Sequence, residues 1–387
     1  MKYKFDHIIR RTGTCCEKWD NNKNVFGRDD ILPMWVADMD FPAPSEAIDA
    51  IKKRLSHPIL GYTFPKEEAY LSVINKMKRA HQTDIKQKDI VFCDGVVGGI
   101  HTAVKLLTKE EDNILILEPV YHPFKMAIKD LNRNPVISNL LLKDGRYEMD
   151  FQDIIEKIKY TKMIIFCSPH NPAGRVWQEE ELIKLGEIIE KSESLIISDE
   201  IHCDLIYKGF KHIPFLKACP NLRDRLITFI APSKTYNLAG LSQSLAIITD
   251  CDIREKFIKG NAFRNYGNLL GIEALTAAYD FGDEYLKELM EYIEGNKDYF
   301  IKYVKENIKK INVIKPEGTY LLWVDFKGLN LSSEALDDLI LNKARLGLNN
   351  GKMFGEAGDF YYRFNIGCPR EYIEEALKRL QDAVNSI

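Results

Sequence analysis

The sequence predicts an α/β fold: a mostly parallel central sheet sandwiched by helices in a large domain, with a smaller α+β domain beside it. The main observation is a series of short, continuous apolar runs that alternate with amphipathic segments from about residue 90. These runs lie at residues 90–92, 114–117, 163–166, 195–197, 226–230 and 245–248. Apolar runs separated by helices are typical of parallel strands that are buried on both faces. A chain of 387 residues also exceeds one comfortable hydrophobic core, so two domains are expected.

The large domain is predicted to span residues 45–283. Ser45 is predicted to cap a helix, because Ala47, Ile48, Ile51 and Leu55 follow it at helical spacing. A second helix is predicted from Glu179 to Lys191, between two of the apolar runs, with its leucines and isoleucines on one face.

The smaller domain is predicted to combine residues 284–387 with residues 1–44, of which the first forty read as an irregular arm. A long amphipathic helix is expected from Glu284 to about Ile308, followed by a pair of strands within residues 311–326. A closing helix is expected after Pro369-Arg370.

Charge and composition exclude several classes of partner. The formal net charge is -3 and the pI is near 6.3, so neither nucleic acid nor an anionic membrane is an expected partner. The chain has eight cysteines but no paired CxxC motifs, which favours free thiols in a reducing cytoplasm and gives no support for a metal site. No apolar stretch approaches the length of a membrane helix, so we expect a soluble, cytoplasmic protein.

Three polar residues follow apolar runs in an order that indicates a specific cofactor. Lys234 comes after the run 226–230, Asp199 after Leu195-Ile196-Ile197-Ser198, and Asn171 opens Asn-Pro-Ala-Gly after the run 163–166. Ligands of parallel sheets bind where the strands end. A lysine amine can form a Schiff base, a carboxylate can pair with a pyridinium nitrogen, and an amide can donate to a phenolate oxygen. These groups suit pyridoxal 5'-phosphate (PLP), although each residue alone also fits an ordinary surface, cap or turn position.

A glycine-rich turn supplies a candidate phosphate site. Residues 94–100, Asp-Gly-Val-Val-Gly-Gly-Ile, end one apolar run and open a helix. Free N–H groups at a helix start, here at Val96 and Val97, attract phosphate, and Ser233 could add a hydroxyl. The turn is neither GxGxxG nor a P-loop, so neither a dinucleotide nor ATP is indicated, and a plain tight turn is the alternative.

Three further side chains complete the candidate site. Tyr121 follows another run and could stack on a pyridine ring, and Arg363 could clamp an α-carboxylate with two parallel hydrogen bonds. Tyr62, in Gly61-Tyr62-Thr63, is a third candidate.

In this order the motifs resemble those of the class I/II aminotransferase superfamily, the fold-type I PLP enzymes, from about Pro33 to Arg370. Residues 35–41 (Trp-Val-Ala-Asp-Met-Asp-Phe), 198–202 (Ser-Asp-Glu-Ile-His) and 365–370 (Asn-Ile-Gly-Cys-Pro-Arg) look like the cystathionine β-lyase (C–S lyase) subgroup. The resemblance implies the type I PLP-dependent transferase fold. It also implies a homodimer with shared active sites.

The resemblance assigns a role to each candidate residue. Lys234 would carry the cofactor and move the Cα proton, with Asp199 on the pyridinium and Asn171 on the phenolate oxygen. His202 would lie near that same oxygen, where many aminotransferases have a tyrosine. Tyr121 would stack on the ring, Arg363 would hold the substrate carboxylate, and Tyr62 would reach the phosphate of the neighbouring subunit.

One position departs from the aminotransferase pattern and bears on the reaction. Many aminotransferases bind phosphate with an arginine eight residues after the lysine, and here that position is Ser242. The lyase subgroup also tends to lack this arginine. The resemblance therefore implies α,β-elimination of L-cystathionine, L-cysteine or S-substituted cysteines to a thiol, pyruvate and ammonia. The alternatives are a PLP-dependent aminotransferase, or a regulatory protein that keeps the fold and binds a protein partner.

Overall fold

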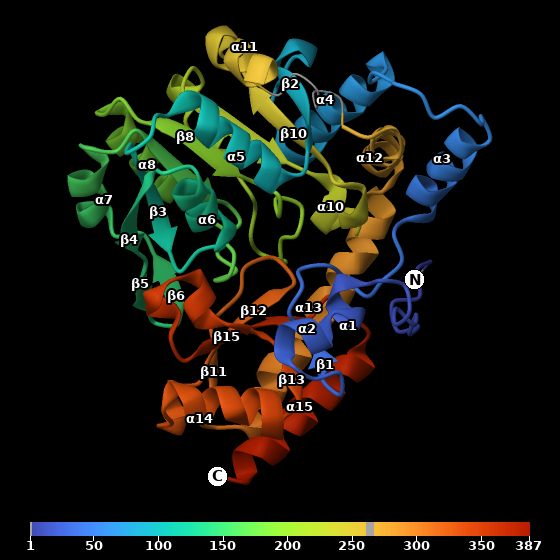
Figure 1. Ribbon diagram of the computed structural model, residues 1–387, viewed down its shortest axis with the longest axis vertical. Coiled ribbons are helices and arrows are strands. Elements are labelled where there is room, and N and C mark those ends of the chain that lie inside the picture. Colours follow the sequence, from blue (N-terminus) through green and yellow to red (C-terminus); the bar gives the residue numbers. More distant parts are fainter. Residues whose placement is uncertain (1, 261–266) are drawn as a thin grey trace.

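The computed structural model describes residues 2–260 and 267–387. Its centre is a seven-stranded sheet in the order β2-β10-β9-β8-β7-β3-β4 (Figure 1). The strands are β2 Ile90–Asp94, β3 Asn113–Glu118, β4 Asn134–Asn139, β7 Met163–Cys167, β8 Leu195–Asp199, β9 Leu226–Ile230 and β10 Gln243–Ile248. All six predicted runs are strands of this sheet, which confirms the predicted fold class. Only β10 runs antiparallel, against β2 on one side and β9 on the other.

The strand residues alternate between two buried faces, as the period of two in a strand requires. Met163 and Ile165 face α5, α6 and α11, whereas Ile164 and Phe166 face α4, α7, α8 and α12. The first set of helices spans Val96–Leu107, Pro123–Asp130 and Cys251–Gly260; the second spans Glu67–His81, Phe151–Ile158, Glu179–Glu190 and Leu269–Phe281. The helix predicted at residues 179–191 is therefore confirmed as α8.

The C-terminal part is built on a second, four-stranded antiparallel sheet. Its order is β11-β12-β15-β14, with bounds Asn312–Val313, Leu321–Asp325, Tyr361–Asn365 and Asn349–Asn350. The predicted long helix is α13, Asp283–Asn307, which runs from the large sheet to the small one, and the closing helix is α15, Arg370–Asn385 (Figure 1). Helix α14, Ser333–Asp338, covers the outer end, and a two-stranded ribbon joins β5 Leu141–Lys143 to β6 Arg146–Glu148.

The N-terminal arm is more regular than the sequence indicates. It contains α1 Glu17–Asp20, α2 Asn22–Phe26 and β1 Leu32–Pro33, which pairs with β13 Leu346–Gly347. The arm therefore lies against the C-terminal part (Figure 1). Backbone hydrogen bonds fix it there, since the Leu32 N–H donates to Arg345 O at 2.9 Å and the Met34 N–H donates to Gly347 O at 2.8 Å.

The predicted cap at Ser45 is wrong. Helix α3 spans Ser45–Leu55, its N-cap residue is Pro44, and the Ser45 hydroxyl donates to Glu46 at 3.1 Å. The apolar face predicted for this helix is also only partly covered, because Ala47 is buried whereas Ile48 and Leu55 are exposed.

Two further observations concern the cysteines and the apolar length of the helices. All eight cysteines are free thiols, and five of them are buried. Among the described residues, no helix is both long and apolar enough to cross a membrane.

Candidate functional site

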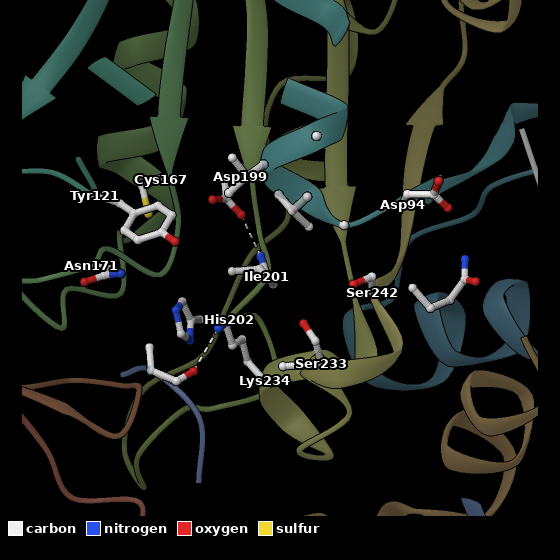
Figure 2. Close-up of a pocket in the computed structure, with 17 residues that line it drawn as sticks. Asp94, Tyr121, Cys167, Asn171, Asp199, Ile201, His202, Ser233, Lys234 and Ser242 are labelled. Carbon is white, nitrogen blue, oxygen red and sulfur yellow. Dashed lines mark hydrogen bonds between the residues drawn. The ribbon is translucent and has the colours of Figure 1, made fainter. Parts of the chain in front are cut away.

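A pocket of about 250 Å³ lies at the edge of the large sheet where β2, β3, β7, β8 and β9 end (Figure 2). It brings together nearly all of the residues that the sequence selects for the cofactor. Those in its wall are Lys234, Asp199, Asn171, His202, Tyr121, Val96, Val97 and Ser233. Parallel strands explain the gathering, because they deliver their carboxyl ends to a single edge.

Lys234 lies in α10, Pro232–Thr235, the short helix that directly follows β9. Its Nζ donates to the carbonyl oxygen of Ala37 at 2.8 Å (Figure 2). Burial lowers the pKa of the amine to about 8, and the nearby Asp38 charge opposes that shift. The amine is therefore far easier to deprotonate than an ordinary lysine, as a nucleophile or a base requires.

Asp199 is the last residue of β8, and its side chain accepts one hydrogen bond from the residues that the structure describes, from the backbone N–H of Ile201 at 3.1 Å. Burial raises the pKa of this carboxyl to about 7. Among the described residues it has no ion-pair partner. A protonated pyridine nitrogen beside it would supply the missing positive charge and restore the carboxylate.

His202 lies nearby and is a neutral imidazole. Burial lowers its pKa to about 3, and neither Lys234 nor Arg363 favours a further positive charge. Its Nδ1 is buried without a hydrogen-bond partner within the described part of the chain. A buried polar atom without a partner is costly, so this nitrogen is suited to a ligand group.

Arg363, on β15, connects the small sheet to the pocket through Asn171. Its Nη1 donates to Asn171 Oδ1 at 3.0 Å, and its Nη2 donates to Trp35 O and to Asn349 Oδ1. Because the amide oxygen of Asn171 is taken, its Nδ2 is left as the donor, which is the orientation a phenolate oxygen needs.

The guanidinium of Arg363 lacks a counter-ion. It is 3 % exposed, forms no ion pair among residues 2–260 and 267–387, and its Nε has no acceptor. Burial lowers its pKa to about 10. Since a buried charge without a partner is unfavourable, the site is built to receive an anion, and a carboxylate matches the geometry of a guanidinium.

The opposite wall of the pocket is suited to a phosphate. Gly95 has φ +78°, which turns the chain from β2 into the 12-residue helix α5, and Val96 and Val97 form its first turn. The Ser233 and Ser242 side chains also line the pocket. Free N–H groups at the start of a helix together with hydroxyls make an anion cradle, so the residues present fit PLP.

Tyr121 and Tyr62 differ in placement. Tyr121 lies in the pocket wall beside Asn171, and burial raises its pKa (Figure 2). Tyr62 is fully exposed and does not line the pocket. Its role therefore stays a prediction that depends on a second subunit.

Residues 35–41, which we call the strap, contribute Ala37 to the pocket wall. The sequence singles out this segment by its family resemblance but does not predict its contacts. Ala37 O accepts from both Lys234 and Tyr320 at 2.8 Å, and Asn365 Nδ2 donates to Val36 O and Asp38 O. These are contacts to backbone atoms, which carry no residue signature. Cys167 and Gln243 are further lining residues that were not selected from the sequence, whereas the lining residues Asp94 and Ile201 belong to the motifs at 94–100 and 198–202.

One group of metal-type ligands lies outside the pocket. His81, Cys203 and Asp204 offer ligand atoms within 4.8 Å of one another. Lys76 Nζ lies 3.0 Å from Asp204, however, and already provides a positive charge there. This cluster is better described as a buried ion pair than as a cation site.

The chain resembles proteins with carbon–sulfur lyase names along its whole length. Cystathionine beta-lyase PatB from Bacillus subtilis is 37% identical over 385 residues, covering 98% of this chain and 100% of the relative. Cystalysin from Treponema denticola, which contains pyridoxal 5'-phosphate, is 38% identical with a TM-score of 0.96 and full coverage of both chains. The PLP-bound C-S lyase from Staphylococcus hominis is 34% identical with a TM-score of 0.93, covering 99% of this chain and 98% of that one.

The family model described as aminotransferase class I and II matches residues 29–380, which include both sheets and every pocket residue named above. The resemblance inferred from residues 33–370 is thereby confirmed. The chain belongs to the aminotransferase class I and II family.

Proposed function

We propose that this protein is a PLP-dependent carbon–sulfur β-lyase. It converts L-cystathionine, L-cysteine or S-substituted cysteines to a thiol, pyruvate and ammonia. The observation that carries the proposal is the buried Arg363 without a counter-ion, joined through Asn171 to the pocket that holds Lys234. Such a site can catalyse several reactions, and elimination is favoured among them because the relatives are named cystathionine beta-lyase and C-S lyase.

When bound, PLP acts as an electron sink for the charge left on the substrate Cα. Arg363 binds the substrate carboxylate and thereby orients the Cα–H bond. Lys234, whose pKa is lowered to about 8, loses its proton far more readily than an ordinary lysine, and in its neutral form it takes the Cα proton. Asp199 keeps the ring nitrogen protonated, and the Asn171 amide donates to the phenolate oxygen. Proton loss at Cα is followed by departure of the thiolate from Cβ.

Uptake of water and release of ammonia complete the balance of the reaction. The bond between Cβ and sulfur breaks with its electron pair leaving on sulfur, and the remaining three-carbon unit hydrolyses to pyruvate and ammonia. No oxidant or second substrate is needed. A 2-oxo acid would be required only by an aminotransferase.

We further propose a cytoplasmic homodimer with shared active sites. Support comes from a run of exposed apolar side chains between α3 and α4, at Ile59, Leu60, Tyr62 and Phe64. Exposed apolar groups gathered in one segment are typical of a protein contact surface. The segment contains Tyr62, whose predicted target is the phosphate in the partner's pocket.

The first experiment measures pyruvate release from L-cystathionine by the PLP-loaded protein without any 2-oxo acid. Steady release over many turnovers is the expected result. Amino transfer that appears only when a 2-oxo acid is supplied would instead make the protein an aminotransferase. Inactivity in both assays, with PLP bound, would favour the regulatory alternative. Lys234→Ala should abolish turnover, and appreciable lyase activity in that variant would remove Lys234 from its role.

A further inference from the structure

The amine and the guanidinium that act on the substrate are both bonded to the strap. Lys234 Nζ donates to Ala37 O at 2.8 Å, and Arg363 Nη2 donates to Trp35 O at 2.8 Å. Lys234 belongs to the segment that follows β9 of the large sheet, whereas Arg363 lies on β15 of the small one. One short piece of backbone therefore connects the two groups, although they come from different sheets.

Side chains, rather than a strand ladder, fix the path of the strap. Within the described chain, no backbone–backbone hydrogen bond reaches its first four carbonyl oxygens. Asn365 Nδ2 donates to Val36 O at 2.6 Å and to Asp38 O at 2.5 Å. Tyr320 Oη donates to Ala37 O at 2.8 Å, the oxygen that also accepts from the lysine amine. Because Asn365 and Tyr320 are fully buried, they hold these oxygens without competition from water.

The far end of the strap is held by Asn237, three residues after Lys234. Its Oδ1 accepts from the Met39 N–H at 3.0 Å, and its Nδ2 donates to Met39 O at 2.8 Å and to Phe41 O at 2.7 Å. Its own backbone has φ +53°, a left-handed conformation that asparagine tolerates better than most residues. Asn237 therefore ties the segment that carries Lys234 to the strap, just as Asn365 ties β15 to it.

We propose that Asn237 and Asn365 are positioning residues, which set the distance between the lysine amine and the arginine guanidinium through the strap. A substrate held by its carboxylate presents its Cα–H bond to the amine only if this distance is fixed, and an error of about 1 Å can lower a rate about a hundredfold. The inference rests on the proposed function for the roles of Lys234 and Arg363. It applies to any reaction that begins with loss of the Cα proton, whether or not elimination follows.

The first test follows proton removal alone. PLP-loaded wild type and Asn237→Asp are given L-alanine in D2O, and NMR measures how fast deuterium replaces the hydrogen on Cα. The hydrogen leaves as a proton on the Lys234 amine, and a solvent deuteron returns to Cα. Alanine has the carboxylate and the Cα–H bond but no leaving group, so neither elimination nor a 2-oxo acid is involved.

Aspartate keeps the size of asparagine and its tolerance of φ +53°, but it cannot donate to Met39 O or Phe41 O. The rate constant per bound PLP at saturating alanine should fall at least about tenfold in Asn237→Asp. The half-saturating alanine concentration should change less than about threefold, because Arg363 keeps its own bond to the strap. Asn237→Gly, which adds no charge, should show the same fall. An unchanged rate constant in both variants would overturn the proposal.

Backbone amide exchange of the cofactor-free protein, followed by mass spectrometry, tests the hold on the strap without catalysis. The Met39 N–H is bonded to Asn237 Oδ1 and the Asp40 N–H to Gly367 O, so both are protected in the wild type. Peptides that contain them should exchange about tenfold faster in Asn237→Asp, because two donated hydrogen bonds are lost. Equal exchange in the two proteins would overturn the proposal.

Asn296→Asp is the matched control. Asn296 is fully buried, and its Nδ2 donates to Ile366 O at 3.0 Å and to Cys368 O at 2.9 Å, so it also binds two carbonyl oxygens, but outside the strap. This variant should keep the wild-type rate constant for alanine per bound PLP. A fall equal to that of Asn237→Asp would overturn the proposal, since any loosened backbone would then have the same effect.

If the Asn237 variants do not fold, Tyr320→Phe serves instead, because it removes only one donor to Ala37 O. Its rate constant for alanine should fall about threefold, and an unchanged value would overturn the proposal. Absence of exchange in the wild type would overturn it as well, since the amine would then not reach a Cα–H bond held by Arg363. Failure of the lyase function alone is distinguishable, because the wild type would exchange alanine but release no pyruvate from L-cystathionine.

Discussion

Replacing Lys234 by methionine should stabilise the cofactor-free protein at neutral pH, although it abolishes activity. Lys234 is a half-buried residue whose amine, within the described part of the chain, donates a hydrogen bond only to Ala37 O. Before the cofactor binds, the folded chain must carry this ammonium group without a carboxylate partner within 4 Å among the described residues. Methionine has a similar length and carries no charge.

The expected gain follows from the pKa of Lys234, which falls from 10.5 in an ordinary lysine to about 8 in the folded chain. This difference makes the charged form cost about 3 kcal/mol in the folded state. Because the folded-state pKa is the lower one, the unfolded chain binds more protons between pH 8 and pH 10.5. The cost is therefore complete below pH 8 and disappears as the pH rises through 10.5. Loss of the Ala37 hydrogen bond offsets about 1 kcal/mol. The net gain is about 2 kcal/mol at pH 7 and close to zero at pH 10.

Urea unfolding of both cofactor-free proteins at equal protomer concentration, at pH 7 and at pH 10, measures this difference. Lys159→Met is the control, because Lys159 is exposed and its ion pair with Glu156 lies at the surface. It should change the free energy of unfolding by less than about 0.5 kcal/mol at either pH. The reasoning would be refuted if Lys234→Met were less stable than the wild type at pH 7, or if its gain were the same at both pH values.

Three further predictions concern the site and the sheet that supports it. Arg363→Met removes the charged partner of the substrate carboxylate. It should therefore lower kcat/KM for L-cystathionine by about a hundredfold in steady-state kinetics, mostly through a higher KM. Asp199→Asn should lower kcat by about a hundredfold at saturating PLP, since the ring nitrogen loses the charge that keeps it protonated; a kcat within threefold of the wild type would contradict that role. Gly99→Ala should destabilise the chain by about 1–3 kcal/mol in urea unfolding, because a Cβ would lie 2.4 Å from the Phe229 ring. Gly98 lies in the same helix, and a Cβ added there would have no atom within 4 Å, so Gly98→Ala should leave the stability unchanged or raise it.

The sequence predicts the strands that are buried on both faces, and it is less successful for elements that are only partly buried. The six predicted strands each contain a mostly apolar run because both faces are covered. Strand β4, Asn134–Asn139, was missed because it lies at the edge of the sheet and contains Asn134, Pro135 and Ser138. The exposed face of α3 has a related cause: its apolar periodicity is genuine, but Ile48 and Leu55 stay exposed in the described part of the chain.

The same distinction applies to the site. Lys234, Asp199 and Asn171 could be selected because each side chain follows a strand and has a chemistry that a cofactor requires. The contact between Lys234 and Ala37 could not be selected, because it uses a carbonyl oxygen that every residue possesses. The link between Arg363 and Asn171 was also hidden, since the two residues are far apart in the sequence, one on β15 and the other in the loop after β7. Sequence reasoning thus finds the parts of the site but not the bonds that hold them.

Most charged side chains that are buried elsewhere in the described chain are ion-paired, and the exception, Arg133, gives its guanidinium to Thr108 and to backbone carbonyl oxygens. Elsewhere, Lys18 is bound to Asp40 and Lys76 to Asp204, and Arg175 is held by Glu181 and Glu317. In the pocket, Asp199 and Arg363 are buried and Lys234 is half-buried, and among the described residues none of the three forms an ion pair. Their shifted pKa values share burial as the main cause. A fold tolerates such a cost where a ligand supplies the missing partners, and a pyridinium and a substrate carboxylate would neutralise Asp199 and Arg363 in turn. Binding of these small molecules should therefore raise the free energy of unfolding by much more than their contact area alone would give, because it removes the cost of the unpaired charges in the pocket.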